Sequence, residues 1–427
     1  MSVFPSRQDT PAQDTGSHPG EAPRPTPQAP LTHRDVQALY ERPPSFTPFL
    51  PWVEYLPDSQ CFLLEDGVSV GALFDLTPVG TEARTAPFMV TLRDAIQIAL
   101  SEALPERDDG PWVLQLYVQD EPNLDSLVQS LQHYPAPSIH QHAYSGVYQR
   151  LMQHHCTRLC APGGLFVDTG LTGSPWRGQI RRVRAVLYRR QTARHRPANN
   201  PYEAEADLNQ VATQLTAALA AAGIRTRRCS GIDLYRWLLP WFNPGEGSAD
   251  ATGAILRSLV DAPVDAELPY GHDFAETLTL SLPCSDATSA TWWFDGLPHT
   301  VISLQGLRRA PEIGHMTAER AAGDHLYSVF DRLPEHTVMV LTLTARPQDA
   351  TRNHVALVKR AAVGDSAEAA LTREDATRVE REMAAGNKLF PLGMAFYVRG
   401  DSLGNLQENV NQLLALLLAN GLLPIGR

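Results

Sequence analysis

An arginine-rich stretch contains the side chains of this sequence that are best suited to binding chemistry. Eight arginines fall between residues 177 and 196, and Tyr188 lies among them. Guanidinium groups at this density bind the phosphates of nucleic acid or anionic lipid headgroups. The favoured interpretation is structural: an edge strand protected by charge, followed by a solvated loop. If the run does bind a partner, a protein is favoured over nucleic acid. The candidate anion or partner patch consists of Arg177, Arg181, Arg182, Arg184, Arg189 and Arg190.

The segment HHCTRLC contains residue types that ligate zinc. Its candidates are His154, His155, Cys156 and Cys160. Their spacing is not that of a zinc ribbon, and no second cysteine pair lies downstream. The two cysteines, four residues apart on one face of a helix, are therefore interpreted as buried small apolar residues, and no metal site is predicted.

Histidines are scattered through the second half of the chain, at positions 272, 299, 315 and 325. A serine or cysteine hydrolase would need a nucleophile elbow or a cysteine–histidine pair, and the sequence has no G-x-S-x-G motif. These histidines are predicted to pack and to form hydrogen bonds, and no catalytic residue is predicted.

A phosphate-binding loop is excluded by the lysines. A Walker A motif needs a lysine directly after a glycine, and the sequence has two lysines against 34 arginines. Lys359 follows Val358, and Lys388 follows Asn387. The segment GNKLF at 386–390 is interpreted as a helix end and a strand entry, so no cofactor is predicted for this chain.

Composition indicates an ordinary folded protein of a reducing compartment. The chain has 427 residues, a net charge of −11 and 43% hydrophobic residues, so any nucleic-acid site would need a local basic patch. Five cysteines and the lack of an apolar leader at residues 1–30 indicate the cytoplasm. No stretch reaches the roughly 20 apolar residues of a spanning helix, so any membrane association is expected to be peripheral.

Residues 1–44 are predicted to be a disordered proline-rich tail with a short helix at 31–43, because seven prolines lie in the first 30 residues. A first α/β subdomain is predicted at 45–245. Its expected elements are a hairpin across Asp66-Gly67, helices at 85–104 and 202–223, and strands at 111–120 and 177–190. The segment 243–253 is the most linker-like internal stretch. The aromatic run at 234–244 is interpreted as core.

A second α/β subdomain is predicted at 246–427. Strands are expected at 276–283, 291–307, 336–345 and 393–400. Helices are expected in 352–363, in 371–386 with a capping box at Thr372 and Asp375, and at 402–420. The fold class is therefore α/β or α+β, with mixed sheets covered by helices. The C-terminal half is expected to be ferredoxin-like, with a split β-α-β arrangement.

Three stretches resemble one family. They are PFLPWVEYLPDSQCFLLEDGVSVGALFDLTP near the start, residues 296–371, and GNKLFPLGMAFYVRGDSLGNLQENVNQLLALLLANGLLPI at 386–425. The sequence over 45–425 resembles the N-terminal region of conjugative-transfer ATPases, the TraC-like, VirB-type ATPases of type IV secretion systems on integrative conjugative elements. The resemblance is one of character and order rather than of a catalytic motif.

The resemblance implies a role without catalysis in this chain. Family members continue into a RecA-like motor with Walker motifs, which this sequence does not contain, so ATP and Mg²⁺ are implied for the motor alone. The implied function is an N-terminal docking and assembly module for DNA transfer by conjugation. Its implied partners are inner-membrane components of the secretion system, a motor domain encoded with it or separately, and further copies of itself. The alternative is a nucleic-acid-binding module that uses the arginine run.

The leucine run LLALLLANGLLPIGR at 413–427 is interpreted as packing. Its uninterrupted apolar part, Leu413–Ala419, is about a third of a bilayer span. Leu406, Val410, Leu413 and Leu417 form one stripe, as in a helix that covers a sheet. Asn420 and Gly421 suit a left-handed helix end, and LLPIGR is interpreted as the start of a connection to a further module.

Overall fold

The computed structural model describes residues 50–81, 84–107, 110–140, 142–161, 166–168, 174–191, 203–248, 251–255, 278–308, 311–318, 320–322 and 325–425. The predicted tail at 1–44, Arg194, Arg196 and His272 lie outside these ranges. Residues 47–427 form one compact unit, and all elements below belong to it.

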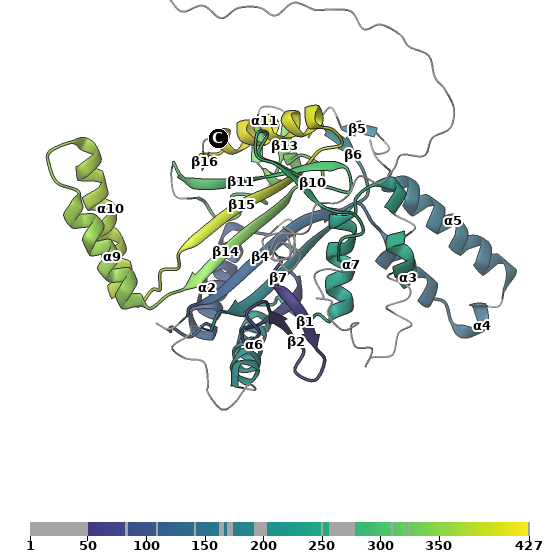
Figure 1. Ribbon diagram of the computed structural model, residues 1–427, viewed down its shortest axis with the longest axis horizontal. Coiled ribbons are helices and arrows are strands. Elements are labelled where there is room, and N and C mark those ends of the chain that lie inside the picture. The colour runs from purple at the N-terminus through teal and green to yellow at the C-terminus, as the bar shows by residue number, and fades with distance from the viewer. Residues whose placement is uncertain are drawn as a thin grey trace, which may run out of the picture. The chain divides into compact units, whose positions relative to one another are not determined.

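A large antiparallel sheet organises this unit (Figure 1). The order of its strands is β1-β2-β3-β7-β4-β14-β15-β11-β10-β9, while β8 pairs with β3 and β16 pairs with β11. The strands are β1 (Trp52–Leu56), β2 (Cys61–Leu64), β3 (Val70–Thr77), β4 (Trp112–Glu121), β7 (Ile180–Arg189), β8 (Arg225–Arg228), β9 (Cys284–Asp286), β10 (Thr291–Phe294), β11 (Leu297–Leu307), β14 (Val338–Ala345), β15 (Leu392–Arg399) and β16 (Leu422–Pro424). Two short pairs stand apart from it, namely β5 (Phe166–Asp168) with β6 (Ser174–Trp176) and β12 (Arg320–Ala322) with β13 (His325–Tyr327).

Asp-Gly turns close two of the hairpins. Gly67 has a φ of 68° in the β2–β3 turn, where Asp66 Oδ1 accepts hydrogen bonds from the backbone N–H groups of Val68 and Ser69. Asp295 and Gly296 both have positive φ, at 51° and 78°, as the tight turn between β10 and β11 requires. The hairpin predicted across Asp66-Gly67 is confirmed.

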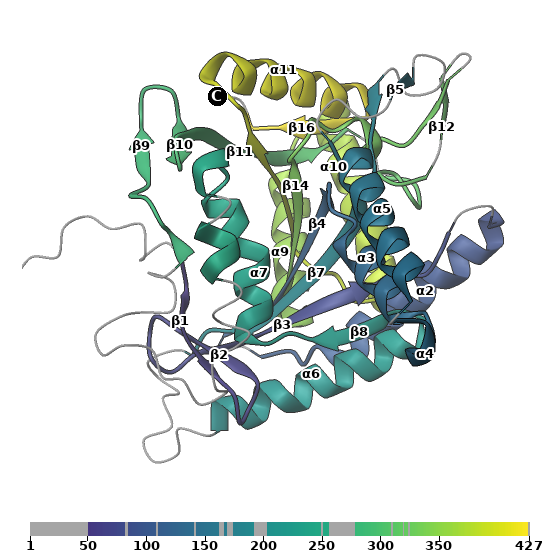
Figure 2. The same cartoon turned by 90° about the vertical axis from the view of Figure 1, so that its right-hand side faces the viewer.

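The helices come from both halves of the chain. They are α2 (Ala86–Ala103), α3 (Asp125–His133), α4 (Pro137–His140), α5 (Ala143–Leu159), α6 (Glu203–Ala221), α7 (Gly231–Phe242), α9 (Gln348–Ala361), α10 (Ala367–Ala384) and α11 (Leu403–Ala419), with 3₁₀ turns at Glu246–Ser248 and Phe330–Arg332. Figure 2 shows the same elements from the side. The predicted mixture of helix and strand is confirmed, and the pairs between described strands are antiparallel.

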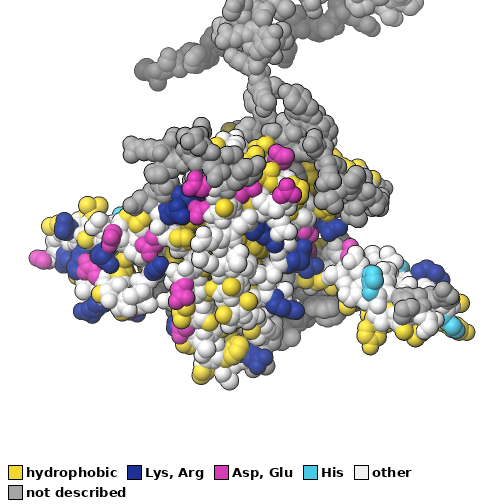
Figure 3. All heavy atoms as spheres, turned by 90° about the horizontal axis from the view of Figure 1, so that it is seen from below, with side chains coloured by type: hydrophobic (Ala, Val, Ile, Leu, Met, Phe, Trp, Pro, Cys, Tyr) yellow, Lys and Arg dark blue, Asp and Glu magenta, His cyan; other side chains and the backbone are white. Residues whose placement is uncertain are grey.

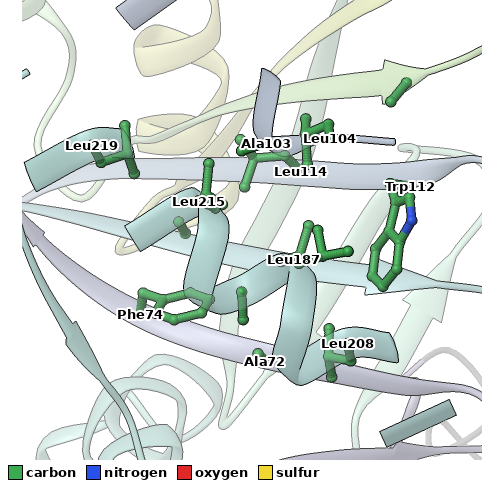
Figure 4. Close-up of a cluster of buried hydrophobic side chains, with 14 of the residues drawn as sticks. Ala72, Phe74, Ala103, Leu104, Trp112, Leu114, Leu187, Leu208, Leu215 and Leu219 are labelled. Carbon is green, nitrogen blue, oxygen red and sulfur yellow. The ribbon is translucent and has the colours of Figure 1, made fainter. Parts of the chain in front are cut away.

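One face of the sheet is apolar and carries two cores. In the first core, α2 and α6 cover β3, β7 and β4, with Phe74, Leu187 and Leu215 almost fully buried (Figure 4). In the second core, α11 covers β15 and β11 with the stripe predicted from the sequence, namely Leu406, Val410, Leu413 and Leu417. The leucine run is therefore packing, and Gly421 ends the helix with a φ of 73°.

The opposite face of the sheet is partly covered by α7. Ser230 and Asp233 form a capping box at its start. The indole N–H of Trp237 donates to Gln119 Oε1 at 3.2 Å, and its ring meets Tyr117 edge to face at 5.0 Å. Trp237 and Phe242 are buried, so the interpretation of this aromatic run as core is confirmed.

The two predicted subdomains share one sheet. Strand β4 of the first half pairs with β14 of the second half along eight residues, from Trp112↔Ala345 to Gln119↔Val338. The predicted boundary near residue 245 is therefore not a break in the sheet. The expected linker is also fastened here, because Asn243 is buried and the backbone N–H of Gly245 donates to Asp295 Oδ2 at 2.8 Å.

Several expected elements differ from the structure. The strand expected at 291–307 is the hairpin of β10 and β11, because Asp295 and Gly296 form a turn within it. The helix expected in 352–363 is α9, which begins at Gln348.

Residues 278–283 do not form the expected strand, because their backbone is bonded by the Asn243 side chain and not by a neighbouring strand. Asn243 Oδ1 accepts from Leu280 N at 2.7 Å, and Asn243 Nδ2 donates to Leu278 O at 2.8 Å. The second C-terminal helix begins earlier than predicted. Its N-cap is Ser366, and Thr372 lies inside it and donates to Glu368 O at 2.9 Å.

The C-terminal end has the split β-α-β form. Strands β15 and β16 are joined through α11, and both pair antiparallel with β11. They therefore run parallel to each other with β11 as their shared neighbour. This part of the predicted ferredoxin-like arrangement is confirmed.

Candidate functional site

The arginine run lies in the interior of the sheet. Strand β7 pairs with β3 along one side and with β4 along the other, so it is not an edge strand. The expectation of a charge-protected edge was wrong, because both sides of β7 are hydrogen-bonded to neighbouring strands. Ala185 and Leu187 point into the core of α2 and α6.

Each of the six patch arginines meets a carboxylate of the same chain. The pairs are Arg177–Glu335 at 3.0 Å, Arg181–Asp120 at 2.9 Å, Arg181–Asp331 at 2.8 Å, Arg182–Glu121 at 3.5 Å, Arg184–Glu121 at 2.7 Å, Arg189–Asp207 at 2.8 Å, and Arg190–Glu65. The partners come from the turn after β2, from β4 and α6, and from the segment that precedes β14. The carboxylate neutralises the positive charge of the guanidinium with which it pairs, so the pair attracts an external phosphate only weakly. The run therefore cross-links the sheet.

The six arginines differ in burial. The side chains of Arg177 and Arg189 are only 6% and 5% exposed, whereas those of Arg182 and Arg190 are 39% and 47% exposed. The buried ones also bond backbone carbonyls, since Arg189 Nε donates to Gly110 O at 3.0 Å. Any external anion would therefore meet Arg182 and Arg190 first.

Neither lysine is placed to hold a nucleotide. Lys359 lies inside α9 and pairs with Glu380 at 2.6 Å. Lys388 donates to Ser101 O at 2.8 Å and pairs with Glu106 at 3.0 Å, beside a depression of about 430 Å³ against α2. Gly386 has a φ of 96° and ends α10. Neither lysine therefore fits a cradle for the phosphates of ATP.

The HHCTRLC segment forms the last turns of α5. His154 and His155 are exposed, while Cys156 is buried and Cys160 is half-buried. Burial raises the pKa of the Cys160 thiol, which disfavours the thiolate that zinc requires. The interpretation of Cys156 as a small buried residue is confirmed. Within the described ranges, no three potential ligands come together as a metal site.

The histidines of the second half are structural where their side chains are described. His315 is buried and shares a hydrogen bond with Asn420 O at 3.0 Å. His299 is buried against Trp241 and Phe294, and burial lowers its pKa to about 4. The described positions agree with the predicted packing role, and the side chain of His325 lies outside the described residues.

Two helical hairpins each carry several exposed apolar residues that the sequence interpretation missed. One is α3–α4–α5, which follows β4, and the other is α9–α10, which connects β14 to β15. They extend from opposite sides of the sheet, with α9–α10 at the left and α3–α4–α5 at the right of Figure 1. Strands β14 and β15 are direct antiparallel neighbours, which a short turn can join. The inserted hairpin is therefore not needed to close the sheet.

The α9–α10 hairpin is apolar near its end. Leu357, Val363 and Leu371 are 63%, 83% and 58% exposed, and all three lie within about one helical turn of the connection between the helices. The hairpin is held closed from within, since Arg373 Nη1 donates to Ala362 O at 2.7 Å and to Gly364 O at 3.0 Å. A closed hairpin with an apolar end is suited to contact another surface.

Comparison with family models shows to which protein family the chain belongs. The family model described as TraC protein matches residues 46–426, a range that includes every described residue. The chain belongs to the TraC family. Membership in the TraC family gives the chain a role in conjugative DNA transfer. None of the curated proteins compared with the chain matches it.

The TraC family match agrees with the resemblance seen in the sequence and covers the sheet, both hairpins and α11. Among the described residues, no helix is long and apolar enough to cross a bilayer. The candidate functional surfaces of this TraC family member are therefore its two hairpins, while its paired arginines support the sheet between them.

Proposed function

We propose that this chain is a docking and assembly module of a type IV secretion machine that transfers DNA by conjugation. Its partners are inner-membrane components of that machine, a motor domain of its own or a separately encoded one, and further copies of itself. It acts on the cytoplasmic side, at the periphery of the inner membrane. Hydrolysis of ATP with Mg²⁺ belongs to the motor, and this chain alone does not turn over nucleotide.

The α9–α10 hairpin is the observation that supports docking best. It interrupts two neighbouring strands, contributes nothing to the two cores of the sheet, and presents Leu357, Val363 and Leu371 at its end. Exposed apolar residues gathered on one projecting element are typical of protein interaction sites. Both lysines form ion pairs with carboxylates, which supports the proposal that this chain alone does not hydrolyse ATP.

The test is complementation of a transfer-deficient strain that lacks this protein. Replacing the three apolar residues together, as Leu357→Gln, Val363→Gln and Leu371→Gln, is expected to lower transfer frequency tenfold or more at normal protein level. Loss of two or three interface anchors costs several kcal/mol of binding. The matched control is Ile98→Gln on α2, which is 56% exposed and lies outside the hairpin. Full transfer by the triple variant would refute docking through this hairpin.

Nucleic-acid binding through the arginine run remains the alternative. The internal pairing of all six arginines speaks against it, since the carboxylates already compensate their charge. A further test in vitro addresses nucleotide turnover: the purified chain is expected to hydrolyse ATP no faster than a mock purification from cells that lack the gene, and turnover above that level would refute the assignment of hydrolysis to the motor.

A further inference from the structure

The α3–α4–α5 hairpin carries an apolar stripe along the outer side of α5. Tyr144, Val147, Tyr148 and Leu151 follow one another at helical spacing and are 78%, 53%, 50% and 61% exposed. The inner side of the helix is already used, because Cys156 is buried there and Val128 is buried on the neighbouring α3. The stripe is therefore not the packing face of α5.

The stripe continues onto the outer end of the hairpin. Tyr134, which follows α3, is 88% exposed, and Ile139 of α4 is 52% exposed. Ser145 Oγ donates to Ile139 O at 2.7 Å and holds this connection against the start of α5. Hydrophobic side chains and histidines occur together on the projecting part at the right of Figure 3. The apolar residues therefore lie on a projecting surface rather than in a groove.

The base of the hairpin is fixed to the sheet. The backbone N–H of Gly178 donates to Leu159 O at 2.7 Å. A Cβ at Gly178 would lie 3.1 Å from Leu124 Cδ1 and 3.3 Å from Leu159 Cβ, so both ends of the hairpin close on this glycine. A firmly seated base gives the outer end a defined direction.

The charge of the hairpin differs from that of the whole chain. The chain has 47 acidic residues and a net charge of −11, yet after Asp125, the first residue of α3, residues 126–161 contain no aspartate or glutamate. The same segment has Arg150 and Arg158, both exposed, and five of the 14 histidines of the sequence. An apolar surface with arginines and without carboxylates is complementary to a membrane surface, where anionic headgroups lie above the apolar acyl chains.

We propose that the outer side of the α3–α4–α5 hairpin docks on the surface of a bilayer that contains anionic lipids. Tyr134, Tyr144 and Tyr148 suit this position, because tyrosine buries its ring at the membrane interface and keeps its hydroxyl in water. Val147 and Leu151 add apolar area, and Arg150 and Arg158 meet the headgroups. The stripe is short, so binding is reversible. This deepens the peripheral docking proposed above and rests on it for its biological meaning.

The experiment is sedimentation of the intact chain with vesicles of phosphatidylcholine, with or without phosphatidylglycerol. The chain is expected to bind vesicles that contain phosphatidylglycerol and to bind pure phosphatidylcholine at least fivefold more weakly. The combined change Tyr144→Gln, Tyr148→Gln and Leu151→Gln is expected to weaken binding on the order of tenfold or more, because affinity follows the apolar area buried. Arg150→Gln is expected to weaken binding to anionic vesicles about fivefold, and Arg158→Gln likewise.

A control pair of equal character lies outside both hairpins. Ile98→Gln on α2 and Leu282→Gln before β9 replace apolar side chains that are 56% and 81% exposed, and both are expected to leave vesicle binding unchanged. Circular dichroism and thermal unfolding establish that each variant is folded. The proposal is overturned if the intact chain binds no vesicles, or if the α5 variants bind as well as the wild type. It is also overturned if those variants lose self-association in sedimentation velocity while vesicle binding stays intact, since the stripe would then be a protein interface.

Vesicle binding and DNA transfer are separate measurements. If the chain binds no vesicles but the α9–α10 variants still lower DNA transfer, the lipid site is refuted and the docking role stands. If the chain binds vesicles but variants of both hairpins transfer DNA normally, the role in the transfer machine is refuted and the lipid site stands.

Discussion

Arg181 and Asp120 form a bidentate pair across the junction of β7 and β4, with Nε–Oδ1 and Nη2–Oδ2 both at 2.9 Å. They are directly opposed in the strand register, and the guanidinium also lies 4.2 Å from the centre of the Phe330 ring. The same Nη2 of Arg181 also donates to Asp331 Oδ1 at 2.8 Å. One arginine thus links two strands of the sheet to the 3₁₀ turn that precedes β14.

Arg181→Ala is expected to lower the free energy of unfolding by about 2–4 kcal/mol, because it leaves two carboxylates without their partner. Arg182→Ala is the matched control, since its pair with Glu121 is longer, at 3.5 Å, and more exposed. The control is expected to cost about 1 kcal/mol or less. Urea unfolding measures both, and equal losses would contradict the cross-linking role.

Replacement of the two most exposed arginines separates structural pairing from DNA binding. Arg182→Ala with Arg190→Ala is expected to leave the affinity for duplex DNA within about twofold of the wild type, because both side chains are paired with carboxylates. Fluorescence anisotropy at several salt concentrations gives the affinity and its salt dependence. A decrease of about two in the slope of log K against log salt would instead assign phosphate contacts to these arginines.

The sequence predicted those elements whose pattern is local. Helix α6 and strand β14 lie within the segments where they were expected, and α11 ends at Asn420 and Gly421 as predicted. The position of β7 in the middle of the sheet was not predictable in this way. Its arginines depend on Asp120, Glu121 and Asp207, which lie in other elements of the chain.

The exposed stripe of α5 shows a second limit of sequence patterns. Tyr144, Val147, Tyr148 and Leu151 have the same spacing as a helix face that packs in a core. The spacing alone cannot tell which side of α5 faces the protein, and Cys156 already fills that side. The sequence does show that residues 126–161 lack acidic side chains. This feature indicates a surface that faces anions only when the apolar stripe is known to be exposed.

Acid is expected to destabilise the chain through His299. Burial lowers its pKa to about 4, and Arg399, opposite it in the strand register, acts in the same direction. The unfolded chain therefore takes up this proton at a higher pH than the folded chain does. The free energy of unfolding falls as pH drops from about 6.5 to about 4, by about 3 kcal/mol for this group. Burial also lowers the pKa of His336, to about 3, which adds a loss of the same sign.

His299→Gln is expected to reduce the acid-induced loss, measured as the difference in unfolding free energy between about pH 7 and pH 4. His154→Gln, at an exposed position of α5, is the control and is expected to leave that difference unchanged. An identical loss in wild type and His299→Gln would show that this histidine does not drive the acid sensitivity.

Gly400 joins β15 to α11 at a place without room for a side chain. A Cβ there would lie 2.5 Å from Leu406 N and 2.6 Å from Leu406 Cα. Gly400→Ala is expected to displace the start of α11 and to cost about 1–3 kcal/mol. Gly404→Ala is the control inside the same helix, where the nearest atom is Ser402 Oγ at 3.9 Å. The control is expected to be neutral or to stabilise by about 0.5–1 kcal/mol, and thermal unfolding distinguishes the two.

The leucines of α11 offer a test of packing on a single helix. Leu413 is fully buried under β15 and β11, whereas Leu418 is 44% exposed. Leu413→Ala is expected to cost about 2–5 kcal/mol through lost burial and the cavity that remains. Leu418→Ala is expected to change stability by about 0.5 kcal/mol or less. Similar effects of both changes would contradict the stripe formed with Leu406, Val410 and Leu417, because a helix that covers a sheet must distinguish its two sides.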